Sequence, residues 1–94
     1  MLEGSQRQRL GHLELYWMDN SAGHPRMGLI VPKFQSTGVA RNRLRRRIRE
    51  IWRREVQQAV GPFDVVIRAR PTAYQAPYRT LRKQLLQWRD ALAK

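Results

Sequence analysis

Residues 37–56, TGVARNRLRRRIREIWRREV, decide the fold because they combine dense positive charge with a helical repeat of apolar side chains. Eight of these twenty residues are arginine. Apolar residues recur at intervals of three and four, which predicts one buried helix face. They are Leu44, Ile48, Ile51, Trp52, Val56 and Ala59. We predict a helix over residues 38–60, with Thr37 as its N-cap and Gly61 followed by Pro62 at its end.

The opposite face of this helix is cationic. It carries Asn42, Arg46, Arg49 and Arg53 at helical spacing. A solvated charged face usually has interspersed glutamates, but Glu50 is the only acid between residues 41 and 54. Like charges at this spacing cost some tenths of a kcal/mol per pair. The pattern therefore favours a surface that binds a polyanion.

Composition indicates nucleic acid as that polyanion. The chain has 94 residues, 19 Lys plus Arg, 7 Asp plus Glu and a net charge of +12. Arginine grips phosphate in two places and stacks on bases, whereas helices that lie on membrane surfaces pair charge with a wide apolar face. We expect a single domain over residues 1–94 that binds nucleic acid, with residues 1–9 flexible.

The absence of cysteine and of a long apolar run predicts the cellular compartment. There is no cysteine, which fits a reducing cytosol. No apolar run approaches the roughly 20 residues needed to span a bilayer. We expect a cytoplasmic protein without a membrane partner.

The flanking segments predict three strands and a second helix. Residues 10–18 alternate in polarity, and with residues 27–31 they predict an antiparallel hairpin. Residues 63–70 predict a strand buried on both faces at the sheet centre. After a loop at 71–76, Pro77 opens a last helix. Its apolar face is Tyr78, Leu81, Leu85, Trp88 and Leu92. We predict a small two-layer α+β sandwich, with a further short strand possible within residues 1–9 or the hairpin.

The residues that could perform catalysis are scattered. The acids fall on different elements, no zinc or serine-hydrolase motif is present, and His12 and His24 stand alone. We expect phosphate binding without a catalytic residue, metal site or bound cofactor in this chain. Trp52, Trp88 and Tyr78 are expected in the core. For Tyr16 and Phe34, stacking on unpaired bases and ordinary packing remain equal alternatives.

The residues from about 13 to the C-terminus resemble the protein subunit of bacterial ribonuclease P. Lys33 is followed at fixed distance by Arg41-Asn42-Arg43, then Arg45-Arg46 and Arg49-Glu50. Residues 61–71, GPFDVVIRARP, and residues 78–88, YRTLRKQLLQW, are similar to the closing strand and helix of that family. Pro32-Lys33-Phe34 stands where the family has a Ser-Lys-Lys type element, and Ser36 where glycine is common.

The resemblance implies a fold like domain 2 of ribosomal protein S5, with a mixed sheet and a left-handed βαβ crossover. The first helix of that family has no counterpart before residues 2–9, LEGSQRQR, in this sequence. The implied function is that of a protein cofactor for a catalytic RNA, which uses Mg²⁺ to remove the 5′ leader of precursor tRNA. Two alternatives stay open, a ribosomal-type structural RNA-binding protein and a basic nucleoid DNA-binding protein.

The resemblance also implies partners and contact residues. The partners are the ribonuclease P RNA and the 5′ leader of precursor tRNA, with no obligate protein partner. The implied contacts to the catalytic RNA are Arg41, Asn42, Arg43, Arg45, Arg46, Arg49 and Arg53. A cleft between the arginine helix and the sheet would hold the leader, near Tyr16, Lys33 and Phe34.

Overall fold

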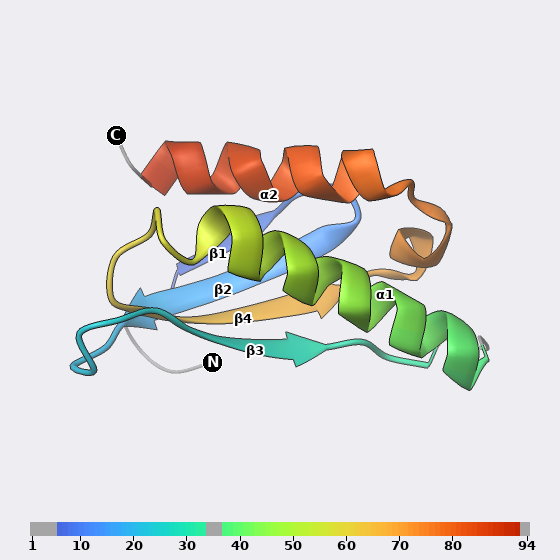
Figure 1. Cartoon of the computed structure of the whole chain (residues 1–94), viewed down its shortest axis with the longest axis horizontal. Helices are drawn as coiled ribbons and strands as arrows, with labels where there is room; N and C mark the ends of the chain where they lie inside the picture. The colour runs from blue at the N-terminus through green and yellow to red at the C-terminus, as the bar shows by residue number, and fades with distance from the viewer. Residues whose placement is uncertain (1–5, 34–36, 93–94) are drawn as a thin grey trace.

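The computed structural model describes residues 6–33 and 37–92. A four-stranded sheet forms one layer, and two helices cover one of its faces (Figure 1). The strands are β1 (Gln6–Arg9), β2 (Leu13–Asp19), β3 (Arg26–Ile30) and β4 (Phe63–Ala69). The helices are α1 (Gly38–Ile51), continued by a π-helical turn at Trp52–Val56, and α2 (Tyr78–Leu92), which follows a 3-10 helix at Pro71–Gln75. The predicted two-layer α+β sandwich is confirmed.

The sheet order is β1-β2-β4-β3. Strand β4 pairs antiparallel with β2 and parallel with β3. The predicted hairpin of β2 and β3 is therefore wrong, because β4 lies between them. Strand β4 contributes the buried residues Val65, Ile67 and Ala69, and a central place in the sheet lets this apolar strand pair along both edges.

Strand β1 corrects the expectation of flexibility for residues 6–9, and residues 1–5 lie outside the described residues. Residues 6–9 pair antiparallel with β2, with Gln6 opposite Trp17 and Arg9 opposite Glu14. All four residues of β1 are exposed. Backbone hydrogen bonds to β2 hold this strand, so no apolar pattern marks it. Strand β1 is the short extra strand that the sequence analysis gave as a possibility within residues 1–9.

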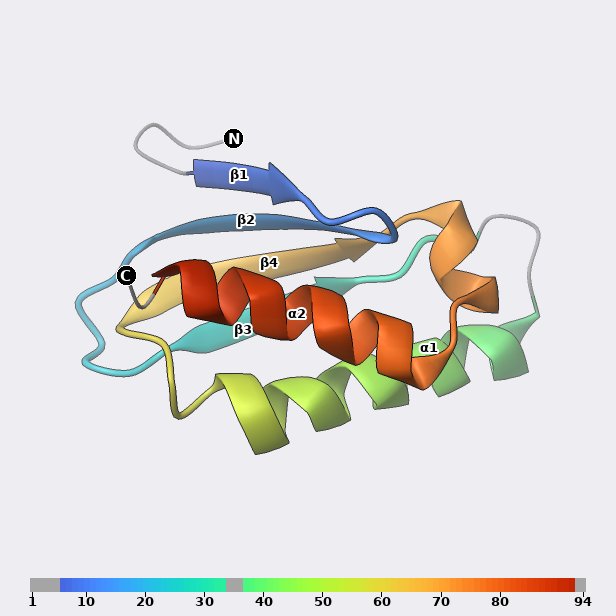
Figure 2. The same ribbon diagram turned by 90° about the horizontal axis from the view of Figure 1, so that it is seen from above.

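The parallel strands β3 and β4 are joined through α1. In Figure 2 the helices lie toward the viewer, and β4 lies to the left of β3 when both arrows are turned to point upward. The crossover is therefore left-handed, as the resemblance implied, although about 98% of such crossovers are right-handed.

The core lies between the sheet and the helices. It includes Leu13, Leu15 and Trp17 of β2, Val65 and Ile67 of β4, Leu44, Ile48 and Ile51 of α1, and Leu81, Leu85 and Trp88 of α2. The ring of Trp88 stands edge-on to Trp17 at a centroid distance of 5.4 Å and lies 6.5 Å from Trp52. The predicted core positions of Trp52 and Trp88 are confirmed.

Helix α1 begins as predicted and ends early. The side chain of Thr37 accepts a hydrogen bond of 3.1 Å from the backbone N–H of Ala40, which confirms the N-cap. At the other end, the N–H of Gln57 donates to the carbonyl oxygen of Trp52 across a π turn. This wider turn rotates later residues off the buried stripe, so Ala59 is exposed and its predicted burial is wrong.

Among residues 6–33 and 37–92, no helix covers the second face of the sheet (Figure 1). Along β4, Val65, Ile67 and Ala69 are buried against the helices, whereas Arg68 is exposed on the other side. The expectation that β4 is buried on both faces is therefore wrong. The sheet therefore has an open face on the side away from the helices.

Candidate nucleic-acid interface

The exposed side of α1 and the neighbouring edge of the sheet form a groove of about 910 Å³. Its lining is Pro25, Met27, Asn42, Arg45, Arg46, Arg49, Glu50, Trp52, Arg53 and Gln57. Strand β3 is an edge strand that pairs with β4 alone, which places the groove at the border of the sheet. We call this feature the arginine groove. It gathers five of the seven residues predicted to contact the catalytic RNA.

The charge of the arginine groove is available to a ligand. Its one acid, Glu50, pairs with Arg54 at 3.3 Å, an i,i+4 pair along the helix. Within residues 6–33 and 37–92, no ion pair holds Arg46, Arg49 or Arg53. Arginine that is not neutralised internally can bind phosphate through two parallel N–H groups.

Within the sequence Arg41-Asn42-Arg43, the first residue stabilises the fold and the other two are exposed on the surface. Arg41 is half-buried, and its Nε donates a hydrogen bond of 2.7 Å to the carbonyl oxygen of Val31. Asn42 and Arg43 are exposed, and with Val39 and Arg46 they line a second hollow of about 290 Å³. Asn42 and Arg43 are therefore placed for contact with RNA, and Arg41 also fastens α1 to the end of β3.

The open face of the sheet carries Tyr16. The strand register places Arg7, Tyr16, Val66 and Gly28 in one row across the four strands. The Tyr16 hydroxyl donates a hydrogen bond of 3.2 Å to the carboxylate of Glu14 on the same strand. An aromatic ring beside an aliphatic surface is a suitable platform for an unpaired base.

A second row on the open face adds charge to this platform. The register aligns Arg9, Glu14, Arg68 and Ile30. Both arginines are exposed, and Ile30 is 50% exposed. Period-two alternation places these residues on the same side of the sheet as Tyr16. The open face therefore combines cations, one aromatic ring and apolar surface.

The residues predicted to hold the leader are not brought together with the arginine groove. Tyr16 lies on the opposite side of the sheet from α1, and the lining of the groove contains neither Tyr16 nor Lys33. Lys33 is exposed in the segment between β3 and α1, and Phe34 lies outside the described residues. The structure thus places the predicted contacts on two surfaces separated by the sheet.

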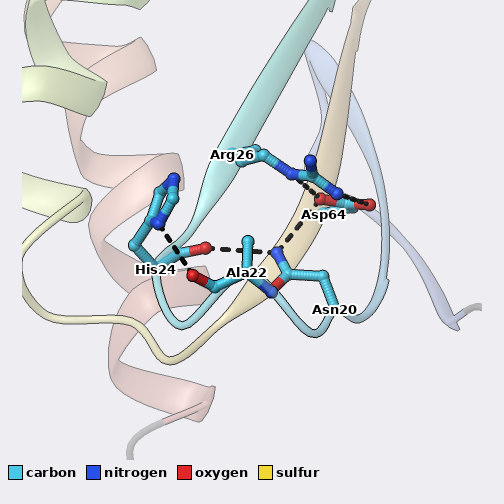
Figure 3. Close-up of polar contacts among 5 residues, drawn as sticks. All are labelled: Asn20, Ala22, His24, Arg26 and Asp64. Carbon is cyan, nitrogen blue, oxygen red and sulfur yellow. Dashed lines mark hydrogen bonds and ion pairs between the residues drawn. The ribbon is translucent and has the colours of Figure 1, made fainter.

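The turn between β2 and β3 is held by a polar network (Figure 3). The amide of Asn20 donates to Asp64 at 3.0 Å and to the carbonyl of His24 at 3.1 Å, and its oxygen accepts from the N–H of Ala22. Arg26 donates two hydrogen bonds to Asp64, which lower the pKa of that carboxyl. This network fixes the turn that borders the arginine groove at Pro25.

The histidines have structural surroundings. The Nδ1 of His12 lies 2.7 Å from the Thr72 hydroxyl, and that of His24 lies 3.1 Å from the carbonyl oxygen of Ala22. In the part of the chain that the structure describes, no three His, Asp or Glu residues gather as a metal site. Neither described helix has the length and apolar character needed to cross a bilayer.

Comparison with known proteins identifies the family. Residues 1–92 match the family model described as Ribonuclease P. The chain belongs to the ribonuclease P protein family. The ribonuclease P protein component of Syntrophobacter fumaroxidans is 37% identical over 82 residues, which are 86% of this chain and 69% of that protein. The component from Rhodococcus opacus is 46% identical over 65 residues, which are 69% of this chain and 52% of that protein.

Solved ribonuclease P proteins share the fold. The protein from Thermotoga maritima superposes with a TM-score of 0.79 at 24% identity, over 95% of this chain and 82% of that one. The protein from Staphylococcus aureus gives 0.80 at 23% identity, over 96% and 82%. The family resemblance predicted from about residue 13 to the C-terminus is confirmed, and the roles of individual residues stay predictions.

Sequence reasoning did not identify the basic residues of the open face as candidate contacts of this ribonuclease P protein. Arg7, Arg9 and Arg68 share a face with Tyr16, as the strand register shows. The alternating polarity of residues 10–18 and 63–70 contained part of this signal, since Tyr16 and Arg68 fall on the polar side of each pattern. The pairing order needed to combine the two patterns comes only from the structure.

Proposed function

We propose that this chain is the protein cofactor of a ribonuclease P ribonucleoprotein, which removes the 5′ leader of precursor tRNA. The observation that carries the proposal is the arginine groove, a surface of unneutralised arginines in a member of this family. The partner RNA supplies the cleavage chemistry with Mg²⁺. The protein contributes affinity and position.

The arginine groove is the proposed contact for the catalytic RNA. Its arginines neutralise phosphates, and binding releases the counterions condensed on the RNA. With about five to seven phosphates engaged, raising the salt from about 50 to 200 mM weakens binding by roughly 10³-fold. A salt dependence near zero would contradict this assignment.

The open face of the sheet is the proposed contact for the leader. A single strand needs a ring to stack on and cations along its backbone, and Tyr16 lies in a row with Arg7. Lys33 follows β3 and is exposed in the connection to α1. In this arrangement the sheet separates the two RNAs, with the catalytic RNA on the helix side and the leader on the far side.

Reconstitution tests the proposal. The chain is mixed with ribonuclease P RNA and a precursor tRNA at a magnesium concentration too low for the RNA alone. Faster leader removal is the expected result, and the Arg46→Glu, Arg49→Glu variant serves as the negative control. No stimulation together with tight binding to duplex DNA would favour a nucleoid protein. No stimulation together with specific binding to ribosomal RNA would favour a ribosomal role.

A further inference from the structure

Helix α2 carries a third cationic surface. Its inner side buries Leu81, Leu85 and Trp88. A shallow depression of about 630 Å³ lies on its outer side. The depression is lined by Arg79, Thr80, Arg82, Lys83, Leu86, Gln87 and Asp90. We call this feature the α2 surface.

The α2 surface keeps two cations without internal partners. Residues 78–89 contain no acid. Arg82 is bound by Glu55 and Arg89 by Asp90, so these two charges are neutralised. Arg79 and Lys83 are exposed, and no ion pair holds either of them within the described residues. They stand one helical turn apart, where like charges repel by some tenths of a kcal/mol.

The α2 surface is separate from the two surfaces described above. It shares no lining residue with the arginine groove. In Figure 1, α2 forms the top of the molecule and the open face of the sheet forms the bottom. The residues that line the α2 surface are therefore distinct from those of the two surfaces already assigned.

The chemistry of the α2 surface fits a duplex. A face that binds single strands uses aromatic rings for stacking, but this depression is lined by arginine, lysine, threonine, glutamine, leucine and aspartate. Duplex RNA is recognised through its phosphates and 2′-hydroxyls, which cations and side-chain amides and hydroxyls can contact. The α2 surface is thus complementary in charge to the sugar–phosphate backbone, and we expect it to bind RNA without preference for a base sequence.

We propose that the α2 surface binds the backbone of a double-stranded RNA segment, through Arg79 and Lys83. This inference goes beyond the proposed function, which uses only the arginine groove and the open face. The chain then holds two RNA segments on its helical layer at once, one beside β3 and one over α2.

The test compares two double variants of equal charge. Arg79→Gln with Lys83→Gln lowers the net charge by two, and the control Ser21→Glu with Gln75→Glu does the same at exposed positions outside the α2 surface. Binding of a 20-base-pair RNA hairpin is measured over a salt series. We expect the first variant to bind about tenfold more weakly, with a log–log salt slope smaller by about 1 to 2. The control should stay close to the parent chain.

The same measurement is repeated with Arg46→Glu and Arg49→Glu already present, so that the arginine groove no longer competes for the hairpin. Residual hairpin binding should then weaken further when Arg79 and Lys83 are also changed. The inference is overturned if the Arg79, Lys83 variant and its charge control bind alike. It is also overturned if that variant loses binding to phosphatidylglycerol vesicles and keeps the hairpin. Either failure leaves the proposed function standing, provided that Arg46→Glu with Arg49→Glu loses ribonuclease P RNA.

Discussion

The Nε of Arg41 donates a hydrogen bond of 2.7 Å to the carbonyl oxygen of Val31. Val31 directly follows β3 and is 2% exposed, and Arg41 lies in the first turn of α1. The first arginine of the Arg41-Asn42-Arg43 motif therefore joins the end of an edge strand to the start of α1. The Nε of Arg41 thus has a structural role, and the rest of its guanidinium group is the part available to RNA.

Replacing Arg41 by glutamine should lower stability. Loss of a charged donor to a buried carbonyl costs about 1 to 2 kcal/mol. Arg41→Lys should lose a similar amount of stability, because lysine lacks the planar Nε–H, while keeping more RNA affinity. Urea midpoints measure both changes. Arg43→Gln is the matched control, since Arg43 is exposed; a midpoint shifted as far as that of Arg41→Gln would refute the role of Arg41.

Arg46→Glu combined with Arg49→Glu should abolish association with ribonuclease P RNA and leave the fold intact. Both side chains line the arginine groove and are exposed. Binding is followed by filter retention, and folding by circular dichroism. An unfolded double variant would show that these residues support the core.

Ile48→Asp should have the opposite effect and unfold the chain. Ile48 is 0% exposed in the core between α1 and the sheet. An unpaired carboxylate buried there costs several kcal/mol. Thermal unfolding measures the loss, and Arg47→Asp on the preceding residue is the control. A cooperative transition close to that of the parent would mean that this helix face is not packed as described.

Tyr16→Ala should weaken binding of precursor tRNA and leave mature tRNA unaffected. Stacking of one base on an aromatic ring is worth about 1 to 3 kcal/mol. Tyr16→Phe retains the ring and removes only the hydrogen bond to Glu14, so its affinity should stay near that of the parent. Affinities are compared for substrates with and without the leader. Equal losses for both substrates would place the leader elsewhere.

Asp64→Asn should make the free energy of unfolding less dependent on pH in the acid range. Hydrogen bonds from Arg26 and then Asn20 hold the pKa of Asp64 below its ordinary value of 3.8. Because the unfolded chain takes up this proton first, the carboxylate contributes stability above pH 3.8 and loses it as the pH falls through the lowered value. The variant should be less stable at pH 7, with a shallower decline below about pH 4. Urea unfolding across pH 2 to 7 measures this, and superimposable curves for variant and parent would contradict it.

The helix elements could be predicted because their apolar residues repeat locally. Leu44, Ile48 and Ile51 fall on one stripe, and Thr37 has the side chain that an N-cap needs. The error at Ala59 arises from the π turn at residues 52–56, a change of hydrogen-bond register that no residue spacing marks. Local periodicity thus identifies the helix but not the point where its geometry changes.

The sheet was less predictable because its pairing is not local. Neighbouring strands in the sequence suggested a hairpin, but Arg26 of β3 lies opposite Asp64, 38 residues further along the chain. The same limit applies to the site. The arginine groove follows from one helix, whereas the row of Arg7, Tyr16 and Val66 requires three strands in the correct order.

Strand β4 is made after every other strand, and it pairs with both β2 and β3. At a synthesis rate of about 5 to 20 residues per second, β4 is made a few seconds after β3, the strand with which it pairs. A nascent chain that stops before residue 63 has α1 without the sheet against which its apolar stripe packs. Helix α1 therefore gains its packing partner only when the last strand has been made, and a protein truncated ahead of β4 should not fold.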